Sequence, residues 1–271
     1  ITHIFEPVVT KAIEAKKPSD LPKLIEVLRM VGKEDPTVKI EINEETGEHL
    51  MHGMGELHLE VIENRIKTEK FVDVQTSPPI VVFRECITKK SPEVMGKTPN
   101  KHNHLFFVVE PLEDSVYQSI KSGKIPEIRI KKKDLEIRDA FVEAGMESKE
   151  AIKVKDIFKG NVLMDLTRGQ VHLGEVIEMI TDMFEDIMGA GPLAKEPCTK
   201  VKVLLTDMKL HEDAIHRGPA QIYPAVREGI RGAMMLANPL TLEPLQTLQI
   251  EAPADYLGDL SKLIGNKRGQ L

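Results

Sequence analysis

The sequence has no tryptophan, and only 3 tyrosines and 8 phenylalanines occur among its 271 residues. Proteins that bind single-stranded nucleic acid without sequence preference stack the bases on several exposed aromatic rings. The shortage of aromatic residues therefore argues against such a surface. The net charge of −6 also argues against a general nucleic-acid coat protein, which would be strongly basic. Any contact with RNA is expected at a small local patch.

Cysteine is scarce as well. The two cysteines, Cys86 and Cys198, stand far apart and lack the spacing of metal ligands, so neither a disulfide framework nor a zinc site is supported. No apolar run approaches the roughly 18 to 20 residues that cross a membrane, and the first residues do not resemble a signal peptide. We therefore expect a reduced, cytoplasmic setting without membrane contact. Because the chain begins with Ile1 and not with Met, we expect a piece of a longer protein.

The first 78 residues alternate between strand and helix patterns. Apolar residues at helical spacing predict a helix at 20–32 and a second helix after Gly55, with Leu59, Ile62 and Ile66 on one stripe. Alternating apolar residues predict strands near 3–7, 38–42, 49–52 and 71–74. The resulting order, βαββαβ, is typical of a ferredoxin-like domain. A run of serine and proline at 77–79 ends this domain.

The rest of the chain predicts a second, larger domain and an incomplete third one. A polar loop is expected at 91–104, and the basic stretch 121–133 is interpreted mainly as solvated surface, with phosphate contact as the minor alternative. After residue 238, one strand and one helix stripe cannot bury both faces of an independent domain. The predicted strands are 80–83, 105–109, 154–158, 162–166, 201–205 and 245–250, and the predicted helices are 112–120, 135–144, 173–187, 226–237 and 256–264.

Residues 210–221 are the most unusual segment, because they combine two histidines, two acids, an arginine and a glycine without helix or strand periodicity. Such a segment is expected to be an exposed loop, where function often concentrates. A zinc hydrolase needs His-Glu-x-x-His on a helix, but His211 and His216 are one residue too far apart, and Gly218 with Pro219 would break the helix. The remaining alternatives are an ordinary surface imidazole and a modification site.

No catalytic group is supported elsewhere. The Gly-Lys-Thr run at 96–98 looks like the end of a phosphate loop, but Ser91 stands where its first glycine should be, so the chain should not bind GTP by itself. No Ser-His-Asp or Cys-His arrangement has local support. We therefore expect no catalytic residue, no metal ligand and no cofactor within this chain.

Several motifs resemble one family. The run Asp-Ala-Ile-His-Arg-Gly at 213–218, followed by Gln221, resembles the diphthamide loop of the elongation factor 2 family, in its archaeal form. Residues 98–105 resemble the segment Ser-Pro-Asn-Lys-His-Asn-Arg-Leu of that family and depart from it at Thr98 and His104. Residues 34–36, 46–48 and 53–60 resemble domain III of the wider family of translocating ribosomal GTPases, and residues 266–269 resemble a segment of its domain V.

This resemblance implies an α+β chain that contains parts of three domains. It implies a ferredoxin-like domain III at 1–78, a ribosomal-protein-S5-like α/β domain IV at 79–238 and an incomplete ferredoxin-like domain V at 239–271. In the family, GTP and Mg are bound by a G domain, which this sequence lacks, and GTP hydrolysis drives translocation of tRNA and mRNA on the ribosome. The tip of domain IV enters the decoding site.

The resemblance also implies the working residues and partners. His216 would carry diphthamide, installed by diphthamide-synthesis enzymes, and ADP-ribosylating toxins would modify it with NAD. The chain would be a monomer that meets the ribosome, tRNA and mRNA. Two alternatives are a scaffold fragment of a paralogous RNA-processing GTPase, which should lack the histidine loop, and a histidine-based metal hydrolase. The tip residues expected to contact RNA are Lys101, His102, Asn103, His211, Asp213, Arg217, Gly218 and Gln221.

Overall fold

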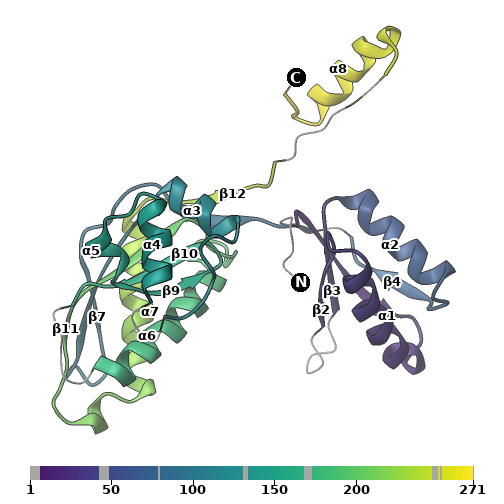
Figure 1. Cartoon of the computed structure of the whole chain (residues 1–271). Helices are drawn as coiled ribbons and strands as arrows, with labels where there is room; N and C mark the ends of the chain where they lie inside the picture. Colours follow the sequence, from purple (N-terminus) through teal and green to yellow (C-terminus); the bar gives the residue numbers. More distant parts are fainter. Residues whose placement is uncertain are drawn as a thin grey trace.

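Figure 1 shows a computed structural model of the chain, which describes residues 7–42, 49–78, 80–130, 134–167, 173–245, 250 and 252–270. Two α+β units, each with its own sheet and core, are joined by extended chain, and a helix follows at the C-terminal side. This confirms the mixed α+β class. No helix within the described residues is long and apolar enough to cross a membrane.

The first unit has the predicted βαββαβ order. Its antiparallel sheet has the strand order β2-β3-β1-β4, so the first strand lies in the middle. The elements are β1 (Val9–Ala15), η1 (Pro18–Asp20), α1 (Leu21–Glu34), β2 (Lys39–Ile42), β3 (His49–Gly53), α2 (Glu56–Thr68) and β4 (Val74–Thr76). One core lies between the sheet and its two helices, and Leu24, Leu28, Met51 and Leu59 are fully buried in it. Each such side chain contributes roughly 1.5–3 kcal/mol through burial.

The predicted ends of this unit need correction. Within the predicted first strand, 3–7, residues 3–6 lie outside the described part of the chain, and β1 begins only at Val9. The last strand begins at Val74 and not at Phe71, because Phe71 has a φ of 54° and a 79% exposed side chain. The motif 46–48 also lies outside the described residues. Strand β5 (Ile80–Val81) pairs with Val9 and Thr10, so this sheet continues past the expected boundary at residue 78.

The second unit is built on a five-stranded sheet with the order β7-β8-β11-β10-β9. Only β10 and β11 are parallel, and helix α6 connects them. The strands are β7 (Val94–Lys97), β8 (His104–Pro111), β9 (Val154–Phe158), β10 (Asn161–Asp165) and β11 (Val201–Lys209).

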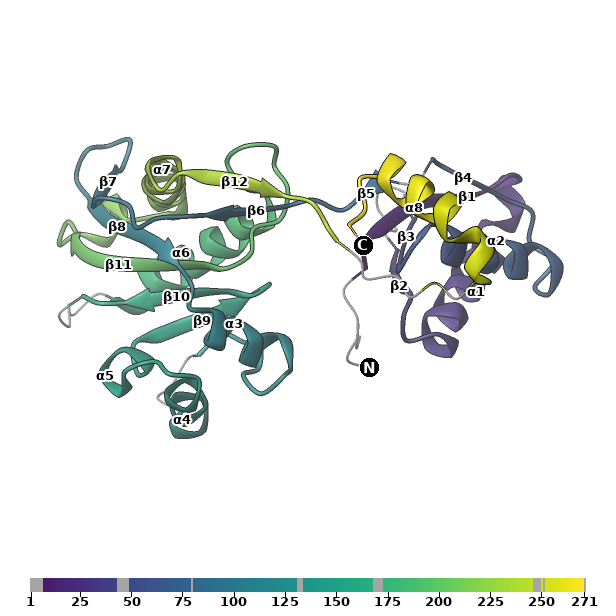
Figure 2. The same cartoon turned by 90° about the horizontal axis from the view of Figure 1, so that it is seen from above.

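Helices cover both faces of this sheet (Figure 2). Side chains alternate along each strand, so Phe107 and Leu205 enter the core below α6 and α7, while Val108 and Leu204 enter the core on the other face. The first face is covered by α6 (Leu173–Gly189) and α7 (Pro219–Leu236), and the second by α3 (Asp114–Lys121), α4 (Leu135–Glu143) and α5 (Ser148–Ala151). The predicted basic stretch is described only in part, because residues 131–133 lie outside the described chain.

The expectation of a polar loop throughout 91–104 is wrong, because this segment contains β7. The strand pairs with β8 and packs against α7. Gly96 makes this contact possible, since a Cβ built there would lie 1.9 Å from the main-chain oxygen of Ala225. The helix and the strand therefore approach each other through bare backbone.

The chain enters and leaves the second unit through two paired strands. β6 (Arg84–Ile87) leads into the second unit and pairs antiparallel with β12 (Pro239–Leu242), which leads out of it. Beyond β12, η3 (Ala254–Tyr256) and α8 (Leu257–Asn266) follow, and α8 has no buried residue. The predicted strand at 245–250 falls mostly on 246–249, outside the described residues, and Leu245 and Ile250 are not in a strand.

Candidate functional site at the tip of the second unit

The first loop of the candidate site joins β7 to β8 at the end of the second unit that lies away from the first unit (Figures 1 and 2). Thr98 organises this loop: its hydroxyl donates to Asn100 Oδ1 at 2.6 Å and accepts from the Asn103 amide at 3.0 Å. Lys101 has a φ of 63°, and its amide donates to the Thr98 carbonyl at 2.8 Å. The turn therefore carries Lys101 and His102 exposed at its outer side.

The second loop joins β11 to α7 and contains the unusual segment. Asp213 begins a single 3₁₀ turn, η2 (Ala214–His216), and its Oδ1 accepts the Ile215 amide at 3.1 Å. No α-helix runs through His211 and His216, as we expected, and α7 begins only at Pro219, which stands at its first position. Proline suits that position because the first amide of a helix needs no partner within the helix. Residues 219–221 of the segment are therefore helical.

Asn103 joins the two loops. Its side-chain amide donates to the His216 carbonyl at 2.8 Å, and its Oδ1 accepts the His211 amide at 2.9 Å. The Asn103 residue is 0% exposed. One buried side chain thus holds both the beginning and the end of the 211–216 segment.

Asn100 makes a second connection between the loops. Its side-chain amide also donates to the His216 carbonyl, at 3.0 Å, and its main-chain amide donates to Gln221 Oε1 at 2.9 Å. The His216 carbonyl therefore accepts two amide donors from the other loop. No hydrogen bond is found between the His216 ring and the described residues, so the backbone is fixed while the imidazole stays unbonded.

Three imidazole rings meet over this scaffold. The ring centroids of His211 and His216 are 4.5 Å apart. The ring centroid of His102 lies 4.8 Å from that of His216 and 5.1 Å from that of His211. The rings come from both loops, so the arrangement depends on the asparagine contacts beneath them. Among the described residues, no group of three or more His, Cys, Asp or Glu is placed to hold a metal ion.

The expected tip residues differ in exposure. Lys101, His102 and Asp213 are exposed, while His211, His216, Gly218 and Gln221 are partly exposed. Arg217 is only 8% exposed, and its buried Nη1 has no hydrogen-bond partner in the part of the chain that the structure describes. A Cβ at Gly218 would meet open space, so nothing in the described fold requires glycine there.

The structure places seven of the eight expected tip residues in two adjoining loops, and the eighth, Gln221, in the first turn of α7 beside them. It also identifies two further residues, Thr98 and Asn100, that the sequence analysis did not count among the site residues. Their signal was present: Thr-Pro-Asn-Lys is typical of a turn in which short polar side chains bond to nearby backbone. What the sequence did not show is that Asn100 bonds to a residue 116 positions away.

Two protein-family models match the chain. The model for elongation factor G, domain III, matches residues 4–78, and the model for elongation factor G, domain IV, matches residues 112–238. The two matched segments follow the division into a first and a second unit.

Relatives of known name match along the whole chain. Elongation factor 2 of Methanocaldococcus jannaschii is 57% identical over 273 residues, which cover 100% of this chain and 38% of the relative. Elongation factor 2 of Thermococcus kodakarensis is 53% identical over 269 residues, covering 99% of this chain and 37% of the relative. Elongation factor 2 of Archaeoglobus fulgidus is 53% identical over 271 residues, covering 100% and 37%. The chain thus spans well under half the length of the relatives that it matches.

Proposed function

The chain belongs to the elongation factor 2 family, and from this we propose that its second unit is the arm by which a translocation factor reaches the decoding site of the ribosome. GTP-dependent movement of tRNA and mRNA is the activity proposed for the whole protein. GTP and Mg would be bound by a G domain outside this chain. The described residues of the chain would supply shape and contacts, and no bond-making step.

The observation that carries this proposal is the double hydrogen bond to the His216 carbonyl. Asn100 and Asn103 hold the backbone of His216 from the other loop, at 3.0 and 2.8 Å. A fixed backbone below an unbonded ring suits a side chain that must be presented to another molecule. We propose that His216 carries diphthamide, because its ring packs against His102 and His211 but makes no hydrogen bond with the described residues that a modification would displace.

The exposed residues of the tip are suited to RNA. Lys101 can pair with a phosphate, and the imidazoles of His102 and His211 can hydrogen-bond to ribose or base edges. Asp213 would act mainly by capping η2. Gly218, which the fold does not require, leaves room for close approach of a partner's backbone. Gln221 accepts from Asn100 and fixes the start of α7 against the other loop.

Two of the tip residues would act from below the surface. Asn103 is fully buried, so its proposed role is to hold the loops and not to touch RNA. Arg217 is almost buried and keeps one Nη1 without a partner. We propose that its charge favours an RNA phosphate above the tip, since guanidinium charge acts strongly where water is excluded.

The domain assignment follows the same family. We propose a ferredoxin-like domain III at 1–78, supported by the βαββαβ order, and a ribosomal-protein-S5-like domain IV at 79–238. Residues 239–271 would be the start of a ferredoxin-like domain V, whose remaining strands would cover the exposed stripe of α8. We propose a monomer that works in the cytoplasm, where ribosomes are.

Modification of His216 can be tested directly. The chain is incubated with diphthamide-synthesis enzymes, and then with an ADP-ribosylating toxin and labelled NAD. We expect labelling of the unaltered chain, loss of label in His216→Gln, and label close to the unaltered level in the control His102→Gln. Intact mass confirms that the added group is present before the toxin step. Full labelling of His216→Gln would disprove the assignment.

Ribosome contact needs a separate test, because a chain can be modified without reaching the decoding site. A photo-crosslinker on Lys101→Cys is expected to label small-subunit RNA, while the same group on Lys149→Cys, an exposed position on α5, is expected to label far less. Equal labelling from both positions would contradict the proposed orientation of the arm.

A further inference from the structure

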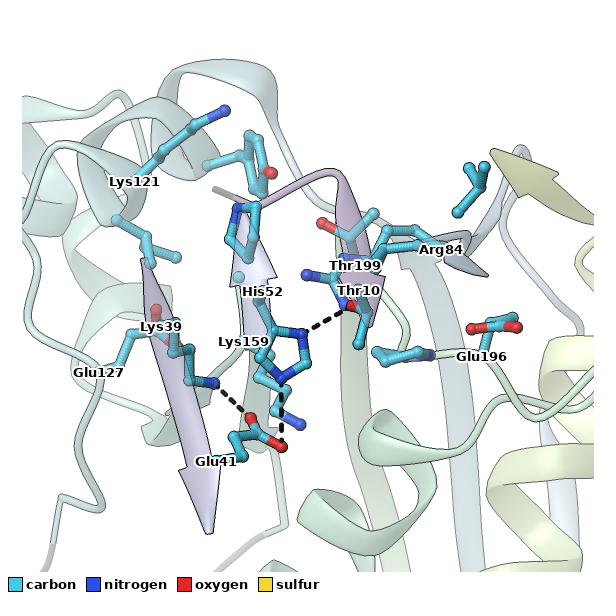
Figure 3. Close-up of a pocket in the computed structure, with 17 residues that line it drawn as sticks. Thr10, Lys39, Glu41, His52, Arg84, Lys121, Glu127, Lys159, Glu196 and Thr199 are labelled. Atoms are coloured by element: carbon cyan, nitrogen blue, oxygen red, sulfur yellow. Dashed lines mark hydrogen bonds and ion pairs between the residues drawn. The ribbon is translucent and has the colours of Figure 1, made fainter. Parts of the chain in front are cut away.

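A cleft of about 550 Å³ lies between the two units, far from the tip (Figure 3). Strands β1, β2 and β3 of the first unit form one wall, and α3, the β9–β10 turn and residues 196–199 of the second unit form the other. The chain that passes from β5 to β6 adds Val81, Val82 and Arg84. The cleft therefore brings together three parts of the chain that do not otherwise share a site.

One side of the cleft is already balanced in charge. Lys39 Nζ lies 2.7 Å from Glu41 Oε1, and this hydrogen bond lowers the pKa of Glu41. Glu41 Oε2 is 3.6 Å from His52 Nε2, and His52 Nδ1 is 2.7 Å from the Thr10 hydroxyl. Figure 3 shows this chain of contacts from Lys39 to Thr10. Glu41 is thus committed to two neighbours of its own unit.

Two other cations of the cleft have no such partner. Among the described residues, neither Arg84 nor Lys159 makes an ion pair. Lys159 Nζ lies over the Phe158 ring, 5.2 Å from its centroid. Burial lowers the pKa of Lys159, and the charges of Lys39 and Arg84 lower it further, while the charges of Glu41 and Glu127 oppose the shift. Positive charge is therefore crowded here. Glu127 and Glu196 also line the cleft, but no ion pair joins either of them to Arg84 or Lys159.

The position of these cations is built into the fold. Lys159 occupies the tight turn between β9 and β10 with a φ of 49°, next to Gly160. A Cβ at Gly160 would lie 2.7 Å from the Tyr117 ring, so the turn is packed directly against α3. Arg84 is the first residue of β6, paired with Leu242. Both cations thus stand on ordered backbone and not on loose loops.

We propose that this cleft binds a phosphate group between Arg84 and Lys159, with the hydroxyl of Thr199 available as a donor on the same wall. A planar guanidinium and an ammonium that make no ion pair with a described carboxylate are suited to binding phosphate. The phosphate would reduce the repulsion between the cations and connect the β9–β10 turn to the start of β6. This site is independent of the tip and of its proposed function.

The phosphate could come from an RNA backbone or from a free phosphate compound, and two probes distinguish them. Binding of a fluorescein-labelled ten-nucleotide oligouridylate is followed by anisotropy at low and moderate salt. Binding of pyrophosphate is followed by titration calorimetry. Because the tip is also proposed to meet RNA, the oligonucleotide is tested in a Lys101→Gln background as well.

The variant is the double substitution Arg84→Gln with Lys159→Gln. We expect at least a tenfold loss of affinity for whichever probe binds the unaltered chain, and for RNA a shallower dependence on salt, since fewer counterions are released. The matched control, Lys124→Gln with Lys149→Gln, removes the same charge from exposed positions outside the cleft and should change affinity less than twofold. Thermal melting verifies that both variants are folded.

Each outcome decides the proposal. Binding of the oligonucleotide alone identifies a phosphodiester ligand, and binding of pyrophosphate alone identifies a free phosphate compound. If neither probe binds the unaltered chain, or if the control pair weakens binding as much as the cleft pair, the site is disproved.

Discussion

The side-chain amide of Asn103 donates a 2.8 Å hydrogen bond to the main-chain carbonyl of His216, which lies 113 residues further along the chain. Because the same side chain also accepts from the His211 amide, the conformation of the histidine loop is set by a residue outside it. Ordering a loop backbone costs roughly 1–2 kcal/mol per residue. A buried amide with two long-range partners helps to offset that cost where the ring must be presented.

Replacement of Asn103 should loosen this loop. In Asn103→Ala, the His216 carbonyl and the His211 amide lose a buried partner, so we expect a loss of about 2 kcal/mol in the free energy of unfolding. Chemical denaturation measures the loss, and hydrogen exchange should show faster exchange at the His211 amide. The control His102→Ala removes an exposed side chain and should stay within about 0.5 kcal/mol of the unaltered chain. An unchanged exchange rate at the His211 amide in Asn103→Ala would contradict this role.

The contact between β7 and α7 should not tolerate a methyl group. In Gly96→Ala the new Cβ would overlap the Ala225 carbonyl, and main-chain atoms cannot rotate away, so we expect a loss of about 3 kcal/mol. Gly174 on α6 serves as the control, because nothing lies within 4 Å of its Cβ position. Gly174→Ala should stabilise the helix by roughly 0.5–1 kcal/mol. Thermal melting that ranks the two variants in the opposite order would disprove this packing.

Asp156 should make the stability of the second unit depend on pH. Burial, and next the charge of Glu185, raise the pKa of Asp156 from 3.8 to about 7, while Arg129 opposes the shift. The folded chain then holds a proton that the unfolded chain releases, so stability falls as the pH rises from about 4 to about 7 and changes little above that. In Asp156→Asn this decrease should disappear, which amounts to a relative gain of about 2 kcal/mol between pH 5 and pH 8.

Urea unfolding at several pH values measures this difference. The control Asp139→Asn removes an exposed carboxylate that pairs with neighbouring Arg138, and its effect should be nearly the same at pH 5 and pH 8. If Asp156→Asn and the unaltered chain differ by a constant amount across that range, Asp156 is not protonated in the folded chain.

Replacement of Glu85 should cost more folding stability than replacement of an exposed carboxylate. It is 0% exposed and accepts the main-chain amides of Leu193, Ala194 and Glu196 at 2.8, 2.8 and 3.0 Å. Glu85→Gln places an amide donor against these donors, so we expect a loss of about 2–3 kcal/mol. Glu143→Gln, at an exposed position of α4, is the control. Hydrogen exchange at residues 193–196 should rise in the first variant only, and unchanged exchange there would contradict the role.

Long helices with a broad apolar stripe were predictable from the sequence. Val176, Ile180, Phe184 and Ile187 recur at helical spacing, and all four are buried in α6. The strand β7 was not predictable in the same way. It has only four residues, one of them glycine, and it exists because Gly96 allows α7 to approach, which is a tertiary contact without a local pattern.

The tip was also predictable only in part. The resemblance to a known family brought its residues together, and the spacing of His211 and His216 argued against a zinc helix. The sequence did not show which of these residues hold the loops together and which face solvent, because that depends on the exposure of each side chain in the folded chain. Asn103 and Lys101 are two residues apart in one loop, yet one is buried and holds the loops while the other faces solvent.

The pairing of β6 with β12 has a consequence for how the second unit can change over time. The chain enters this unit through Arg84–Ile87 and leaves it through Pro239–Leu242, side by side. All of the second unit lies between these two paired strands. Its helices and loops can therefore lengthen, shorten or be exchanged without altering the spacing of the two strands. A unit attached in this way can be exchanged for another of different length without changing the rest of the fold.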